Sequence, residues 1–132
     1  MDFNNTQAIY LQIADYVCDQ IQLQLWQTDD KIPSVRDMAV NLEVNPNTVM
    51  RSYEHLQQQE IIHTRRGMGY FVSENAAHKI MEVRRAQFFK EELPLFFRKI
   101  YRLGIEPSAL QPEFEQFRQA EKNGNISASI NK

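Results

Sequence analysis

The sequence predicts a mainly α-helical fold with one small β-hairpin, in which an N-terminal domain precedes a helical C-terminal region. Three observations lead to this class. Apolar residues recur at helical spacing over most of the 132 residues. Residues typical of helix N-caps at positions 34 and 45 indicate the starts of two short helices. Two β-prone stretches flank a glycine-containing turn at 65–69.

The first element is an amphipathic helix expected over residues 5–25. Its apolar positions recur every four residues: Ile9, Ile13, Val17, Ile21 and Leu25. Asn5 or Thr6 is expected to cap its first turn. Cys18 lies beside the apolar stripe and is predicted to be a buried thiol. As the single cysteine of the chain, it excludes an intramolecular disulfide.

Two short helices are predicted next, over residues 34–42 and 46–59. Ser34 and Asp37 have the spacing of a capping box, with Asp in place of the usual Glu. Asn45-Pro46 combines a capping residue with proline at the first helical position. Since only a few residues separate the two helices, the pair is typical of a helix-turn-helix.

A β-hairpin is predicted after these helices, with strands near 61–64 and 70–72 and a turn at 65–69. A hairpin directly after a helix-turn-helix indicates a winged helix-turn-helix domain, which we place at residues 1–73. A helical region is expected at 74–122, interrupted near Leu93 by Pro94 and near Gly104. Residues 123–132 are polar and are expected to be disordered.

Composition excludes several classes of protein. No apolar run is long enough to span a bilayer, and the first residues lack the features of a signal peptide, so we expect a cytoplasmic protein with no membrane partner. The three histidines lack metal-ligand spacing, and no phosphate-cradling loop occurs. We therefore expect no catalytic residues, no metal and no cofactor.

A winged helix-turn-helix suggests binding to double-stranded DNA. Its second helix places its first turn against base edges in the major groove, and its wing reaches the adjacent minor groove. Asn47 and Thr48 fall on that first turn, and Arg51 lies one turn further on. The candidate DNA-binding residues are Arg36, Asn45, Asn47, Thr48, Arg51, Arg65, Arg66 and Gly67. Each has a plain structural alternative: the asparagines cap a helix, and the arginines are solvated surface residues.

The stretch from Ile9 to Val72 resembles the N-terminal domain of the GntR family of bacterial regulators. The matching strings are Ile9-Tyr-Leu-Gln-Ile13, Ile32-Pro-Ser-Val-Arg-Asp-Met-Ala39, Val44-Asn-Pro-Asn-Thr-Val49 and Thr64-Arg-Arg-Gly-Met-Gly-Tyr-Phe-Val72, together with Tyr53 and Leu56. The resemblance implies that Arg36, Asn47, Thr48, Arg51, Arg66 and Gly67 contact operator DNA. It also implies a transcription regulator, which we expect to be a repressor.

Four positions depart from the family pattern. Glycine is usual where this chain has Gln24, Asp29, Glu43 and Glu60. Because glutamine and glutamate adopt left-handed backbone conformations less readily than glycine, we expect the turns after the first and third helices to have a different geometry.

The C-terminal region is too short to enclose a ligand pocket within one subunit. It resembles that of the YtrA subfamily, whose small helical tail mainly dimerises. Its aromatic residues are too many for two lone helices to bury, so we expect a homodimer on a palindromic operator. The predicted dimer interface comprises Phe88, Phe89, Phe96, Phe97, Tyr101, Phe114 and Phe117. In the alternative, these side chains pack only on the N-terminal domain. A small-molecule effector remains open.

Two other functions compete with DNA binding. Residues 1–73 contain nine acidic residues and five Lys or Arg, which favours a winged helix that binds protein instead of DNA. A small enzyme would need convergent polar residues in a pocket, and the sequence offers none.

Overall fold

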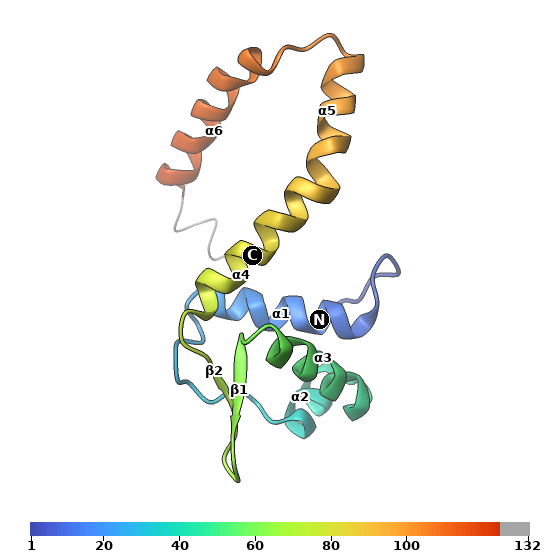
Figure 1. Cartoon of the computed structure of the whole chain (residues 1–132), viewed down its shortest axis with the longest axis vertical. Helices are drawn as coiled ribbons and strands as arrows, with labels where there is room; N and C mark the ends of the chain where they lie inside the picture. The colour runs from blue at the N-terminus through green and yellow to red at the C-terminus, as the bar shows by residue number, and fades with distance from the viewer. Residues whose placement is uncertain (125–132) are drawn as a thin grey trace. The chain divides into compact units, whose positions relative to one another are not determined.

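The computed structural model describes residues 1–124 and confirms the mainly helical fold with a single hairpin (Figure 1). The chain forms two compact units, Met1–Arg84 and a second that begins at Arg85. The first contains the helices α1 (Ile9–Gln22), α2 (Val35–Leu42) and α3 (Pro46–Gln58), the strands β1 (Ile62–Arg65) and β2 (Gly69–Val72), and most of α4 (Ala76–Gln87).

The core of the first unit lies where α1 and α2 pack on α3. Ile13 and Val17 of α1 and Val49, Tyr53 and Leu56 of α3 are almost completely buried there. Cys18 is buried as predicted, and its burial raises the pKa of the thiol to about 12. The start of α4 closes the core with Ala76 and Ile80, which are also fully buried.

α1 is shorter than the sequence predicted at both ends. Its N-cap is Ala8, with no capping side chain, so the expected cap at Asn5 or Thr6 is wrong; Thr6 instead donates to the side chain of Asn4. α1 ends at Gln22 because Gln24 turns the chain into the left-handed region. Leu25, expected on the apolar stripe, lies beyond this turn and is 64% exposed.

The prediction of altered turns is also wrong. Gln24, Asp29, Glu43 and Glu60 all have positive φ, from 56° to 68°. The left-handed backbone that glycine favours is thus kept by residues that bear a Cβ atom. The substitution of glycine in these turns therefore shows as backbone strain and not as a change in the sign of φ.

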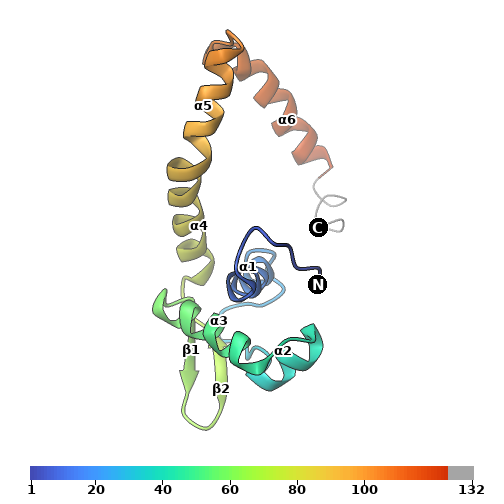
Figure 2. The ribbon, with the colours of Figure 1, turned by 90° about the vertical axis from the view of Figure 1, so that its right-hand side faces the viewer.

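The hairpin pairs Ile62 with Val72 and Arg65 with Gly69, in antiparallel register. The segment before α2 joins it, because Lys31 forms a bridge with Phe71, and the Ile32 amide donates to the Tyr70 carbonyl at 3.0 Å. The wing therefore follows α3 in the chain and is also hydrogen-bonded to the segment before α2. Figures 1 and 2 both place its tip beyond α2 and α3 at one end of the unit.

The second unit continues from α4 through a π-helical turn (Phe88–Glu92) into α5 (Leu93–Arg102). The interruption predicted near Leu93 is present, since Pro94 lies in the first turn of α5 and lacks the amide that a continuous helix would use. A 3-10 turn (Pro107–Leu110) leads into α6 (Gln111–Asn123). Of the tail predicted to be disordered, Asn123 still belongs to α6, and residues 125–132 lie outside the described part of the chain.

Candidate nucleic-acid interface

The exposed face of α3 is set by its buried face. Val49, Ser52, Tyr53 and Leu56 point into the core, which leaves Asn47, Met50, Arg51 and Glu54 on the opposite, exposed side. Thr48 lies at the edge of this face and is half-buried. A polar side chain that is exposed on the first turn of a helix is free to meet an external partner, and Asn47 meets that condition.

The N-terminal caps predicted for α2 and α3 are both present. The Ser34 hydroxyl accepts from the Asp37 amide at 3.1 Å and begins α2. The Asn45 side chain accepts from the Asn47 amide at 2.8 Å and begins α3. The Asn45 side chain is thus engaged in capping, whereas no hydrogen bond within residues 1–124 engages the side chain of Asn47.

Tyr53 fixes α3 to the segment that leads into α2. Its hydroxyl donates to the Pro33 carbonyl at 2.8 Å, and burial raises the pKa of the phenol well above its usual value, so it stays protonated as a donor. Its ring meets that of Tyr70 edge-on at 4.8 Å. α3 is therefore joined both to the segment before α2 and to the wing, which keeps the exposed face in a fixed place relative to the hairpin.

Three of the four predicted arginines lack an acidic partner in the described part of the chain. Arg36, Arg51 and Arg66 are exposed, and none lies within 4 Å of a carboxylate there. Arg65 differs, because its guanidinium lies 2.8 Å from the Asp29 carboxylate and 4.2 Å from the centre of the Phe71 ring. The two arginines of the wing are thus held differently: Arg65 is fastened to the body, whereas Arg66 has no acidic partner among residues 1–124.

The wing turn has the geometry that its glycines suggest. Gly67 has a φ of 74°, and a Cβ atom there would meet no atom within 4 Å, so backbone conformation rather than crowding favours glycine. Met68, beside it, is 55% exposed. The tip of the hairpin therefore offers Arg66, a bare backbone and an apolar side chain to a partner.

Three residues of this surface were not singled out by the sequence analysis. Met50 is 41% exposed on α3, and the Tyr70 hydroxyl lies 3.8 Å from its sulfur. Tyr10, on α1, supports the guanidinium of Arg51. No local pattern marks these contacts, because each joins segments far apart in the sequence.

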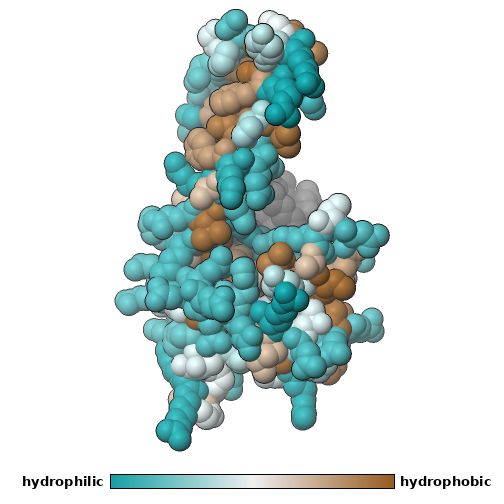
Figure 3. All heavy atoms as spheres, turned by 45° about the vertical axis from the view of Figure 1, so that its right-hand side comes forward, coloured by the Kyte–Doolittle hydropathy of each residue, from teal (hydrophilic) through white to brown (hydrophobic). Residues whose placement is uncertain are grey.

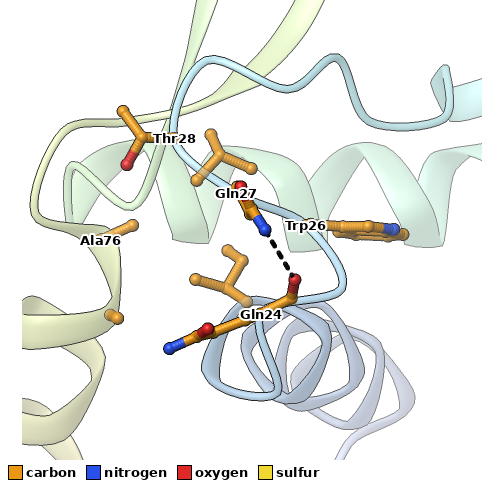
Figure 4. A pocket seen from close by; sticks show the side chains of 8 residues that line it. Gln24, Trp26, Gln27, Thr28 and Ala76 are labelled. Carbon is orange, nitrogen blue, oxygen red and sulfur yellow. Dashed lines mark hydrogen bonds between the residues drawn. The ribbon is translucent and has the colours of Figure 1, made fainter.

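A hollow of about 300 Å³ lies on another part of the first unit, between the end of α1, the loop 24–28 and the start of α4 (Figure 4). Gln24, Gln27 and Thr28 supply its polar groups, and Ala76 faces them from α4. None of its lining residues is ionisable, so the hollow has no charged group with which to hold a charged ligand.

Other kinds of site find no basis in the described residues. Within residues 1–124, no group of three or more His, Cys, Asp or Glu side chains is placed to hold a metal ion. Over the same range, no helix has the length and apolar character that crossing a bilayer requires.

The structure combines three features: a helix-turn-helix, an exposed first turn on its second helix, and a hairpin fastened beside it. Together they define a class of protein, the winged-helix DNA-binding transcription regulators.

The model of the bacterial regulatory proteins of the gntR family matches residues 9–72. The chain is 37% identical over 103 residues to the uncharacterized HTH-type transcriptional regulator YhcF of Bacillus subtilis, which covers 78% of this chain and 84% of that protein. It is 31% identical over 124 residues to the HTH-type transcriptional repressor YtrA of the same species, and the match covers 94% of this chain and 95% of that protein.

Solved structures agree with these relatives. A GntR-family transcriptional regulator from Bacteroides thetaiotaomicron superimposes with a TM-score of 0.77 at 48% identity, covering 86% of this chain and 99% of that one. A GntR-family regulator from Listeria monocytogenes gives 0.67 at 31% identity, covering 86% and 98%. The chain therefore belongs to the GntR family and is YtrA-like. It is a DNA-binding transcription regulator and not an enzyme.

Proposed function

We propose that the chain is a cytoplasmic, homodimeric repressor that binds a palindromic operator, with α3 in the major groove and the wing in the adjacent minor groove. Asn47 and Thr48 contact base edges, and Arg36, Arg51, Arg66 and the Gly67 backbone hold the DNA backbone. Asn45 and Arg65 serve the same interface, the first by capping α3 and the second by fastening the wing. The repressor YtrA, similar over almost the whole chain, supports the direction of regulation.

The single observation that carries this proposal is the set of exposed arginines on α2, α3 and the wing that lack a carboxylate partner among the described residues. Arg36, Arg51 and Arg66 face no carboxylate within 4 Å in residues 1–124, although the first 73 residues are acidic overall. Arginines without a carboxylate partner have their N–H donors available for an external anion. DNA phosphates are anions of this kind.

The homodimer is supported by what the second unit leaves exposed. Among its described residues only Ile100 is buried. The seven aromatic residues predicted for the interface are all exposed in the single chain, between 43% for Phe88 and 85% for Tyr101. Figure 3 shows apolar side chains gathered over the upper part of the view, where α5 and α6 lie. An apolar surface of this kind is stable in water once a second copy covers it.

Operator binding is tested by selecting DNA from a random pool with the full chain and then titrating the selected duplex at several salt concentrations. Three phosphate contacts from each of two protomers predict that log K falls with log salt at a slope of about −5. Arg36→Ala and Arg66→Ala should each weaken binding and make this slope less steep. Binding that does not respond to salt, or no selected DNA at all, would favour the protein-binding alternative.

The dimer is tested by sedimentation of the full chain and of Phe96→Glu and Phe117→Glu. Each variant places a charge in the predicted interface and should yield monomers at concentrations at which the original chain is dimeric. Val40→Glu is the matched control, because Val40 is 70% exposed on α2 of the first unit. Phe variants that remain dimeric would show that the aromatic surface packs elsewhere.

A further inference from the structure

The guanidinium of Arg51 rests on the face of an aromatic ring. Its Cζ lies 3.9 Å from the centre of the Tyr10 ring, close enough for a cation–π interaction. Tyr10 is the second residue of α1, and Arg51 is on the exposed face of α3. The contact therefore joins the helix that supports α3 to a side chain of the proposed DNA-binding surface.

The ring that supports Arg51 is itself fixed. Tyr10 is half-buried, and the ring of His55 meets it edge-on at 6.1 Å. At the backbone of Tyr10, the carbonyl accepts a hydrogen bond from the buried Ser52 hydroxyl at 2.6 Å. Since His55 and Ser52 both belong to α3, the helix that carries Arg51 also holds the ring beneath it.

Stacking leaves the donors of Arg51 free. The five N–H groups of a guanidinium lie in its plane, whereas a cation–π contact uses its face. A carboxylate partner would instead occupy the same in-plane donors that a phosphate needs. The ring thus restricts where the side chain goes without consuming its hydrogen-bonding capacity, and it reduces the conformational entropy lost when DNA binds.

We propose that Tyr10 is a positioning residue, whose ring holds the Arg51 guanidinium in place for a phosphate of the operator backbone. This inference rests on the proposed function and deepens it, because it names what orders one of the phosphate contacts. The ring orders this long side chain before DNA binds, so its removal should weaken operator binding about two- to fivefold, through the added cost of immobilising the side chain.

The experiment uses the full chain and the duplex selected with it, with Kd measured by fluorescence anisotropy over a range of salt. Arg51→Ala should weaken binding and reduce the salt slope by about one for each protomer. Tyr10→Leu should weaken binding two- to fivefold, Tyr10→Phe should bind like the original chain, and Tyr10→Leu should have no further effect once Arg51→Ala is present.

Two controls separate positioning from general loss of stability. Thermal unfolding is measured for every variant, and Tyr16→Leu removes another half-buried tyrosine of α1, one that contacts Trp26 and not Arg51. Arg51→Lys changes the other partner of the contact. It keeps the positive charge of the side chain and removes the planar guanidinium group. It should preserve the salt slope while weakening binding about as much as Tyr10→Leu.

Several results would overturn the inference. Equal losses from Tyr10→Leu with and without Arg51, or an unchanged Kd for either Arg51→Ala or Arg51→Lys, would show that the stack does not serve binding. A loss from Tyr10→Phe as large as that from Tyr10→Leu would assign the effect to the hydroxyl. These outcomes leave operator binding by the original chain intact, whereas failure to select any DNA removes the proposed function itself.

Discussion

Glu43 and Glu60 hold left-handed backbone conformations, with φ of 56° and 59°. Glu43 is the C-cap of α2, and Glu60 follows the C-cap of α3. Both side chains are exposed, and neither makes a hydrogen bond or ion pair with the described residues. Replacing either residue with glycine therefore removes strain at the backbone without removing a side-chain contact.

The size of the gain follows from two opposing effects. A left-handed conformation costs a residue with a Cβ atom about 1–2 kcal/mol, and glycine costs about 0.4–1 kcal/mol through the greater freedom of the unfolded chain. Glu43→Gly and Glu60→Gly should each raise the free energy of unfolding by about 0.5–1 kcal/mol. For a unit of this size, each kcal/mol corresponds to about 4–8 °C in Tm.

Thermal and urea unfolding, followed by circular dichroism, measure this effect in the two single variants and the double variant. The matched controls are Glu43→Ala and Glu60→Ala, which remove the carboxylate and keep the Cβ atom, and these should not gain stability. If the alanine variants gained as much as the glycine variants, charge rather than backbone strain would be responsible. A lower Tm for the glycine variants would refute the reasoning.

Three further predictions concern single residues of the first unit. Because burial raises the pKa of Cys18 to about 12, its thiolate population at pH 8 should be roughly a thousandfold below that of an ordinary thiol, and a disulfide reagent should modify it rapidly only after unfolding in guanidinium. Asn45→Ala should lower the free energy of unfolding by about 1 kcal/mol and Asn45→Ser by much less, as urea titration would reveal. Asp29→Asn breaks an exposed ion pair with Arg65, so stability should change by less than about 1 kcal/mol. Operator affinity should fall in the same variant, because the ion pair that fastens the wing is lost, and an unchanged or higher affinity would contradict this role of Arg65.

The helix-turn-helix was predictable because its signals are local. Ser34 and Asn45 accept hydrogen bonds from amides two or three residues away, so a short window of sequence contains both partners. The sequence predicted too long an α1 because a local pattern continues past the point where the helix ends. The periodicity continues through Leu25, and only the left-handed turn at Gln24 removes that residue from the stripe.

The supports of the candidate site could not be predicted from local pattern. Tyr10 holds Arg51 and Asp29 holds Arg65 across long separations in the sequence, and both contacts exist only once the core has assembled. The arginines themselves were recognisable by type and position. Which of them is fastened and which is free depends on tertiary packing, and this determines how each can act.

The π-helical turn Phe88–Glu92 is a place where the helix absorbs one extra residue. A π turn accommodates one residue more than an α turn, and each residue of an α-helix rotates the side-chain direction by about 100°. Because the extra residue is absorbed within this turn, deleting one residue here would give a regular helix in which Phe96 and Phe97 face nearly the same direction, whereas a deletion in the α-helical turns on either side would rotate them by about 100°. The π turn can therefore lose one residue without redirecting the aromatic surface beyond it, whereas the α-helical turns on either side cannot.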